Sequence, residues 1–265
     1  MKKAKLIVLL LLAFFFSAFL LLVALLALKS SANSFVFGKK IVVLEIYGPI
    51  TYSPEPGSVP ALELLRILHS LDKNPSVAAV ILDINSPGGT VVACMDVEQA
   101  LQEMKKPVLA VCDELCTSGA YLIASAARKI FVSNYTLTGS IGVIFSYLDF
   151  AGLLKKFNVT YVVIRQGKYK DAVNPFEPLK PAARKEIEEL VRSAYREMVQ
   201  IVEHNRHINF SKLPLYVRES GVITGAQAIK YGLADSTGTI FTAIKYAEQH
   251  YCHNSCSVEY LSVVI

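Results

Sequence analysis

The sequence has little net charge outside its first 32 residues. The chain carries 27 lysines and arginines against 22 aspartates and glutamates, and four of the lysines lie in residues 1–32, which hold no acidic residue. That leaves 23 basic against 22 acidic residues, a net charge of +1, for the rest of the chain. A nearly neutral domain without a block of lysine and arginine is not typical of nucleic-acid-binding proteins. We therefore expect no nucleic-acid partner.

The cysteines are too few and too loosely spaced for a disulfide scaffold or a metal centre. Their number, five, is odd, and Cys94 and Cys112 fall in an expected helix and an expected strand, where they read as small core residues. Near the C-terminus, the spacing of Cys252, His253 and Cys256 fits no ligand pattern well. A local disulfide and, more strongly, a plain exposed tail are favoured over a metal site. We expect no metal and no cofactor.

The sequence also lacks a histidine that is placed like a catalytic base. The histidines fall in expected surface helices or in the C-terminal tail: His69, His204, His207, His250 and His253. The order of serine, histidine and aspartate in a triad varies among folds, so order alone excludes nothing. None of these histidines has site-like neighbours, however. A hydrolase built on this chain therefore needs another base.

What the sequence does contain is a long apolar segment near its N-terminus. Residues 6–28 carry no charge. As a helix they would be about 34 Å long, enough to cross a bilayer core of roughly 30 Å. Lys2, Lys3 and Lys5 precede the segment, so the positive-inside rule places the N-terminus in the cytoplasm and the rest of the chain outside.

An uncleaved anchor and a cleaved secretory signal are the two interpretations of this segment. The small residues at 30–32 would suit cleavage, but the apolar run is longer than the roughly 7–15 residues usual for a signal peptide core, which favours the anchor. Either way the following domain is delivered to the same side. We expect a single-pass protein of the cytoplasmic (inner) membrane, in contact with lipid through residues 6–28, with its main domain on the periplasmic or extracytoplasmic side.

Strands and helices alternate along the remainder of the chain. We divide it into a cytoplasmic tip and anchor (1–28), a linker (29–40), one domain (41–249) and a tail of unassigned role (250–265). Apolar runs predict strands at 41–46, 77–84, 107–112, 129–132 and 159–165. Apolar residues at helical spacing predict helices at 59–72, 90–105, 148–157 and 182–205, and residues 225–235 predict a short helix capped by glycine. This alternation indicates an α/β fold with mostly parallel strands.

A serine follows the third expected strand, on a turn of small residues that opens an apolar helix. Ser118 and Gly119 begin this run, which is how a fold exposes a nucleophile beside free backbone N–H groups. Asn-Ser-Pro-Gly-Gly at residues 85–89 follows the second expected strand. Because ligands bind at the carboxyl ends of parallel strands, the two turns can share a cleft. The N–H of Gly119 and that of Gly88 or Gly89, preferably Gly89, are the candidate oxyanion donors.

The candidate base is a lysine. A lysine accepts a hydroxyl proton only when neutral, which desolvation favours. Lys168 and Lys170 lie in the irregular segment Gly-Lys-Tyr-Lys-Asp at residues 167–171. Taken singly, each of these motifs has a plain structural interpretation: an N-cap for Ser118, a turn for the glycine pair and a solvated loop for the lysines.

Together the motifs resemble the bacterial signal peptide peptidase A family, serine–lysine proteases with the Clp protease/crotonase-like fold. The resemblance covers residues 41–242 and rests on residues 85–89, 118–127, Thr-Gly-Ser-Ile-Gly-Val at 138–143, and 167–171. It implies that Ser118 is the nucleophile and that Lys170, the lysine directly before the aspartate, is the base, whereas Lys168 matches a variable position. The short length resembles the single-repeat members. Ser140 is a candidate to orient the lysine.

We therefore expect a membrane-anchored serine endopeptidase with a Ser-Lys dyad. By resemblance, its substrates are cleaved signal peptides and other apolar segments, and it forms a homo-oligomer, since similar enzymes form rings. One alternative is a crotonase-like acyl-CoA enzyme, which could use the same oxyanion glycines; the expected export argues against it. The other alternative is an inactive scaffold that organises membrane proteins.

Overall fold

The computed structural model describes residues 16–23, 38–53, 55–252 and 256–263. The chain divides into two units, residues 1–39 and 40–265, which we describe separately. In the first unit, residues 16–23 are helical and exposed. None of the helices within the described ranges is both long enough and apolar enough to cross a membrane. Most of the expected anchor, residues 6–28, lies outside the described residues, so the anchor stays a prediction.

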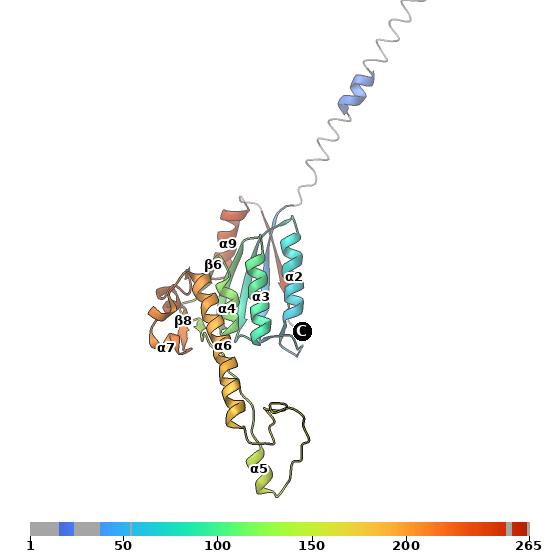
Figure 1. Ribbon diagram of the computed structural model, residues 1–265. Helices are drawn as coiled ribbons and strands as arrows, with labels where there is room; N and C mark the ends of the chain where they lie inside the picture. Colours follow the sequence, from blue (N-terminus) through green and yellow to red (C-terminus); the bar gives the residue numbers. More distant parts are fainter. Residues whose placement is uncertain (1–15, 24–37, 54, 253–255, 264–265) are drawn as a thin grey trace, which may run out of the picture. The chain divides into compact units, whose positions relative to one another are not determined.

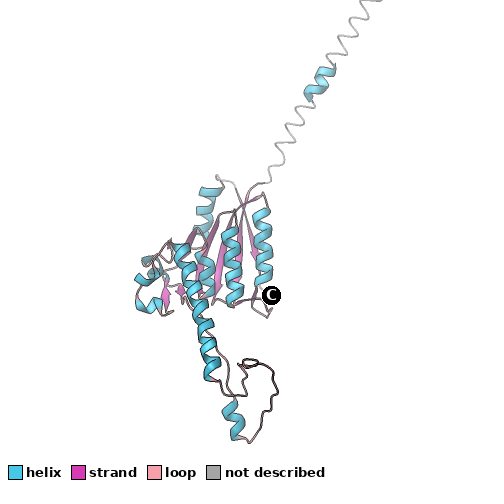
Figure 2. Ribbon diagram, in the orientation of Figure 1, coloured by secondary structure: helices cyan, strands magenta, loops and turns pink. Residues whose placement is uncertain are grey.

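The second unit is built on a mainly parallel β-sheet, as the sequence predicts (Figures 1 and 2). Its central path consists of parallel pairs in the order β10-β1-β4-β5-β6-β9. The strands of this path are β1 (Lys40–Tyr47), β4 (Val77–Ser86), β5 (Val108–Thr117), β6 (Lys129–Val132), β9 (Ser236–Thr237) and β10 (Ser257–Ser262). Off the path, β7 (Leu137–Gly139) pairs in parallel with β5 and antiparallel with β8 (Val222–Thr224). A separate pair joins β2 (Ile50–Thr51) to β3 (Val59–Pro60).

Helices cover both faces of this sheet (Figure 2). The residues of β1 alternate between two cores: Val42 and Leu44 face the larger one, whereas Ile41 and Val43 face the smaller one. The larger core is closed by α2 (Ala61–Lys73), α3 (Val91–Glu103) and α4 (Gly119–Ser125), and the smaller by α9 (Ile240–Tyr251). Burial on both faces explains why the central strands are nearly continuous apolar runs.

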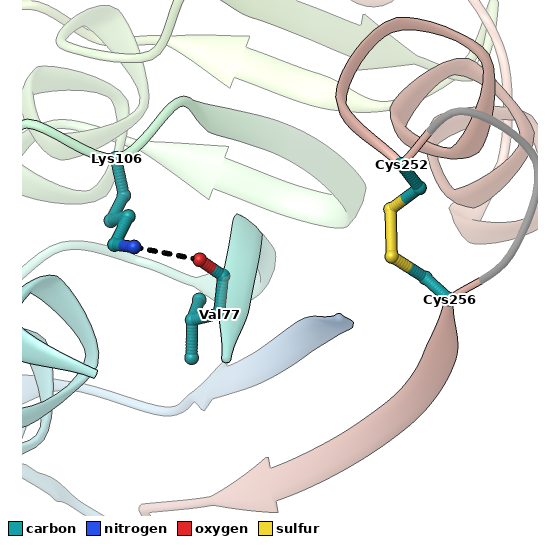
Figure 3. The surroundings of a disulfide bond; sticks show 4 residues. All are labelled: Val77, Lys106, Cys252 and Cys256. Carbon is teal, nitrogen blue, oxygen red and sulfur yellow. Dashed lines mark hydrogen bonds between the residues drawn. A yellow bond between two sulfur atoms is a disulfide. The ribbon is translucent and has the colours of Figure 1, made fainter. Parts of the chain in front are cut away.

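The C-terminal residues complete the sheet instead of forming a plain tail. Beyond residue 249, α9 continues to Tyr251, and β10 pairs in parallel with β1 over six residues, from Ser257 to Ser262. A disulfide joins Cys252 to Cys256 across this connection, with Cα atoms 5.7 Å apart (Figure 3). The domain boundary at 249 and the favoured exposed tail are therefore corrected, because β10 caps the edge of β1. His253 lies outside the described residues, and the rest of the described chain offers no cluster of metal ligands.

One segment of the second unit projects away from the sheet (Figure 1). Helix α6 (Pro181–Arg206) packs its C-terminal half on the core through Met198 and Val202. Its N-terminal half leads to residues 144–180, which we call the arm and which include α5 (Ala151–Lys156). The predicted strand at 159–165 is wrong: these residues form no strand, because no neighbouring strand pairs with them.

Short elements link α6 to α9. They are η1 (Phe210–Lys212), α7 (Leu215–Arg218), β8 and α8 (Gly225–Lys230). A capping box between Thr224 and Gln227 starts α8, and Gly232, at φ +75°, follows its end. The glycine-capped helix is thus present, although it is shorter than the predicted 225–235.

Candidate active site

Ser118 occupies a strained turn between β5 and α4. Its φ is 55° and its ψ is −126°, a conformation that non-glycine residues rarely adopt and that costs roughly 1–3 kcal/mol. The Ser118 N–H donates to the carbonyl of Gly139 in β7 (2.9 Å), which holds the turn in place. The Ser118 Oγ lies 3.5 Å from the carbonyl oxygen of Gly142, at the limit of a hydrogen bond. Such a turn exposes a serine hydroxyl at the end of a sheet.

The glycine turn after β4 lies against the Ser118 turn. A register shift in the pairing of β4 with β5 sets Ser86 beside Cys116, so both strands end at the same place. A Cβ added at Gly88 would lie 2.8 Å from the Gly119 nitrogen, and one added at Gly119 would lie 3.4 Å from the Gly89 nitrogen. The two turns therefore touch through their backbones, which only residues without side chains allow.

The hydrogen bonds of this turn distinguish Gly89 from Gly88. The Gly88 N–H donates to Ser86 Oγ at 3.2 Å. On either side of Gly89, the Ile50 N–H donates to the Gly88 carbonyl and the Thr90 N–H donates to the Ile50 carbonyl. These bonds fix the backbone at Gly89 and leave its own N–H without an acceptor among the described residues. Across the described residues no hydrogen bond engages the N–H of Gly89 or of Gly119. The geometry thus favours Gly89 over Gly88, a choice that the sequence left open.

A cavity of about 390 Å³ opens in front of Ser118. It contains Ser118, Gly89, Gly119 and Ser140, so four of the five predicted site residues share one cleft. The remaining lining is mostly apolar: Pro87, Val91, Cys94, Met95, Leu122, Gly142, Val143, Ile144, Met198 and Ser220. A second cavity of about 710 Å³ shares Val143, Ile144 and Ser220 with the first and runs along α6. Because they share these residues, the two cavities form one groove.

Two further serines, Ser140 and Ser220, line the cleft. The Ser140 N–H donates to the Gly221 carbonyl (3.1 Å), and the Ser220 Oγ donates to the Ile141 carbonyl (2.8 Å). Both residues have positive φ, 48° and 63°. Ser140 lies where a hydroxyl could reach an amine in the cleft, and its orienting role stays a prediction. Sequence reasoning missed Ser220, because nothing in its local sequence marks it as close to Ser118.

Lys170 does not lie in this cleft. It is exposed on a turn of the arm, and neither Lys170 nor Lys168 lines either cavity of the groove. Lys168 borders a small cavity between the arm and the start of α6, and its amine lies over the ring of Tyr169. Among the residues that the structure describes, no histidine, aspartate or glutamate lines the Ser118 cavity. The chain by itself therefore does not bring the predicted base to the predicted nucleophile.

The thiols near Ser118 are poor competitors as nucleophiles. Burial raises the pKa of Cys94 to about 12 and raises the pKa of Cys116 well above its usual value. A thiol reacts as its thiolate, so both stay unreactive at neutral pH. Both are buried core residues, as is Cys112; the sequence predicts this role for Cys94 and Cys112.

The chain matches known protein families and is similar in sequence to several known proteins. The family model described as Peptidase family S49 matches residues 100–252, and the Clp protease model matches residues 50–136. The chain is 33% identical over 187 residues to a protein of Methanocaldococcus jannaschii that carries the name of a protease, covering 70% of this chain and 60% of that protein. It is 31% identical over 208 residues to an Enterococcus faecium protein that carries the name signal peptide peptidase SppA (76% and 60% covered). It is 33% identical over 211 residues to the chloroplastic serine protease SPPA of Arabidopsis thaliana (78% and 31% covered).

Proposed function

Because the chain belongs to peptidase family S49, we propose that it is a membrane-anchored serine endopeptidase that cleaves remnant signal peptides and other apolar segments. The observation that carries this proposal is the half-buried Ser118, which lines the cleft on its strained turn beside the unused N–H groups of Gly89 and Gly119. The chain spans about 60% of the length of the first two relatives described above, whose names refer to proteases.

The proposed reaction is acyl transfer to Ser118 followed by hydrolysis. The Ser118 Oγ bonds to the carbonyl carbon of the scissile peptide while its proton passes to the neutral amine of Lys170. The carbonyl oxygen becomes an oxyanion, which accepts hydrogen bonds from the N–H groups of Gly89 and Gly119. The C–N bond then breaks, and the leaving amine takes the proton from Lys170. Water, deprotonated by Lys170, then bonds to the acyl carbon. The bond from this carbon to Ser118 Oγ breaks, and Lys170 returns its proton to Oγ as the acid product leaves.

Lys170 must reach Ser118 for this reaction, and two arrangements could achieve it. The arm could fold back on its own chain, or the arm of a neighbouring copy could enter the cleft. The second arrangement is favoured by the apolar side chains that the arm leaves exposed: Ile144, Phe145, Leu148, Leu153, Phe157, Val159, Val162 and Ile164. Large exposed apolar patches on a protein surface often mark sites of protein–protein contact. We propose a homo-oligomer in which each copy supplies Ser118 to one site and Lys170 to the next.

A neighbouring copy would also solve a chemical problem. A lysine becomes a general base when a low-dielectric environment favours its neutral form. The Lys170 side chain is exposed in the single chain, whereas the Ser118 cleft is lined by Met95, Leu122 and Met198. Insertion of the arm into an apolar cleft would therefore create the environment that the base requires.

The groove supports apolar substrates in an extended conformation. Near Ser118 its lining is mostly apolar. Along α6 it continues past Val143, Ile187 and Val191, with charged side chains at its margins: Arg184, Glu188, Arg192, Arg218 and Glu219. Burial of a peptide's apolar side chains against such a surface stabilises binding by a free energy of about 25 cal/mol per Å² of apolar surface removed from water. A signal peptide remnant is rich in these side chains, so it suits the groove.

We further propose that the domain lies on the extracytoplasmic side of the membrane. The apolar segment 6–28 and the lysines before it favour an N-terminal anchor with this orientation. The Cys252–Cys256 disulfide supports the same side, since disulfides persist in oxidising compartments. A site close to the membrane suits peptides that leave the bilayer.

An active-site probe separates this proposal from its two alternatives. A fluorophosphonate should label the wild-type protein at Ser118 and should not label Ser118→Ala, because labelling requires an activated serine. An acyl-CoA enzyme would instead bind immobilised CoA without being labelled, and a scaffold would do neither. Absence of labelling in an assembled protein that also fails to cleave apolar peptides would overturn the proposal.

A further inference from the structure

The turn that presents Lys170 contains two residues with positive φ. Asp171, the next residue, has φ +67°, in the left-handed region, and Gly167 at the start of the turn has φ +101°. The turn is closed by the Lys170 N–H, which donates to the Gly167 carbonyl, and by the Ala172 N–H, which donates to the Tyr169 carbonyl, both at 3.2 Å. Aspartate is one of the few residues other than glycine that adopt the left-handed conformation, because its short side chain can form local hydrogen bonds. The hydrogen bonds of the Asp171 side chain therefore bear on the conformation of this turn.

Asn174 forms such a hydrogen bond. It is only 5% exposed, although the arm around it is mostly accessible. Its Nδ2 donates to Asp171 Oδ2 (2.6 Å) and to the Tyr161 hydroxyl oxygen (3.0 Å), and its Oδ1 accepts from the Phe176 N–H (2.8 Å). One side chain thus ties the Lys170 turn to the segments before and after it.

The partners of Asn174 belong to a small core within the arm. The Tyr161 ring packs on Phe176 with centroids 5.4 Å apart, and Phe176 packs on Phe150 with centroids 6.2 Å apart. Arg165 pairs with Glu177 at 2.5 Å beside this aromatic cluster. The segments that flank the Lys170 turn are therefore anchored before any partner binds. A hydrogen bond from an anchored residue to the turn restricts where the turn can present its side chain.

We propose that Asn174 is a positioning residue that holds the Asp171 carboxylate, and through it the Lys170 turn, in the conformation that delivers Lys170 to Ser118. The inference rests on the proposed function, because it assumes that Lys170 is the base. The role acts through geometry: a displacement of about 1 Å at a catalytic group can cost about 100-fold in rate. Asn174 itself does not touch the substrate.

A hydrogen-bond swap tests this inference. Asn174→Asp keeps the acceptor for the Phe176 N–H but sets two carboxylates against each other, so the link to Asp171 is lost. Asp171→Asn tolerates the left-handed conformation, since asparagine adopts it readily. In the double variant Asn174→Asp/Asp171→Asn, the amide of residue 171 donates to the carboxylate of residue 174, and the link returns with its donor and acceptor exchanged.

The expected results are specific to positioning. Asn174→Asp should lower kcat by about 10- to 100-fold with little change in KM. The midpoint of its pH–rate profile should move to higher pH, because the amine is no longer held in the apolar cleft. The double variant should recover kcat to within about threefold of wild type and restore the midpoint. The matched control Asp149→Ala breaks a hydrogen bond elsewhere in the arm, in which Asp149 Oδ1 accepts from the Ala151 N–H (2.9 Å), and it should leave the midpoint unchanged.

Two outcomes would overturn the inference, and they differ from failure of the proposed function. Wild-type kcat and pH profile in Asn174→Asp would show that the link does not position Lys170. Failure of the swap to restore a folded, assembled double variant would reduce Asn174 to a role in arm stability; circular dichroism and native mass spectrometry detect this. Full activity in Lys170→Ala, measured in parallel, would instead remove the base on which the proposed function depends.

Discussion

The sheet core and the arm carry the two halves of the proposed dyad in very different ways. Around Ser118 the chain is complete: the strands beneath it are buried on both faces, and its turn is locked between Gly139 and the glycine pair 88–89. Around Lys170 the chain is ordered locally by Asn174, yet its apolar side chains face outward. Under the proposed function, folding alone builds the Ser118 half of the site, whereas the Lys170 half is completed only by assembly.

The largest effect expected from this comparison is loss of catalysis at either half. Ser118→Ala and Lys170→Ala should each lower kcat by about 10³-fold or more. The two residues act as one catalytic unit, so removing either one removes the catalysis that both provide. Peptide cleavage by purified, assembled variants measures the effect. Lys168→Ala is the matched control, since Lys168 is a basic neighbour on the same turn, and it should retain most of the activity. Loss of activity in Lys168→Ala alone would move the base by two residues.

A smaller effect on assembly and activity should distinguish an exposed apolar residue of the arm from an exposed aromatic residue near the sheet. Ile164 is 98% exposed in the single chain, and Tyr135, which follows β6, is 85% exposed. If a neighbouring copy covers the arm, Ile164→Ser should weaken assembly and lower activity by about tenfold, the effect of losing roughly 1.4 kcal/mol of burial. Tyr135→Ser should change neither. Light scattering and cleavage assays measure both variants; equal behaviour would argue against a covered arm.

The smallest expected effect concerns the core alone. Asp83 is 6% exposed on β4, where its Oδ2 accepts from the Tyr47 hydroxyl and its Oδ1 has no hydrogen-bond partner within the described chain. Burial, with the nearby carboxylate of Asp113, raises the pKa of Asp83 to about 6. The folded state therefore binds this proton more tightly than the unfolded state, and its stability falls as pH rises from about 4 to about 6.

Replacement of this carboxyl group should remove the pH dependence. Asp83→Asn keeps an acceptor for Tyr47 and cannot ionise, so it should raise stability at pH 7.5 by about 1–2 kcal/mol. The gain should vanish near pH 4, where wild-type Asp83 is protonated. Urea unfolding at the two pH values measures it. An equal shift at both pH values would mean that packing, not charge, is responsible. Activity at saturating substrate should stay unchanged, since Asp83 lies outside the groove.

Much of the core could be predicted from sequence because its signals are local. The runs at 41–46 and 77–84 are apolar on both faces, as in β1 and β4, and the strand ends set Gly89 and Ser118 at one edge. The residues at 159–165 have the same composition but form no strand, because a strand also needs a neighbour to pair with. The opposite error occurs at β10: the sequence predicts an exposed tail where the structure has a strand. The pairing of β10 with β1 depends on tertiary contacts, which the local sequence does not reveal.

The candidate site also combines features that the sequence predicts with features that depend on the tertiary structure. The order of motifs was enough to predict that Gly89, Gly119 and Ser118 share a cleft, since each follows the end of a parallel strand. The choice of Gly89 over Gly88 required the hydrogen bond from the Gly88 N–H to Ser86 Oγ. The position of Lys170 on a projecting arm could not be predicted, because the path of residues 144–180 depends on long-range packing of α6.

Complementation between two inactive variants tests the central claim most directly. Ser118→Ala and Lys170→Ala are co-expressed in equal amounts, and mixed oligomers are verified by native mass spectrometry. If neighbouring copies share each site, random mixing pairs an intact serine with an intact lysine in about a quarter of the sites, so about a quarter of the wild-type activity should return. Mixed oligomers that stay as inactive as their parents would contradict the account and place both residues of the dyad in one chain.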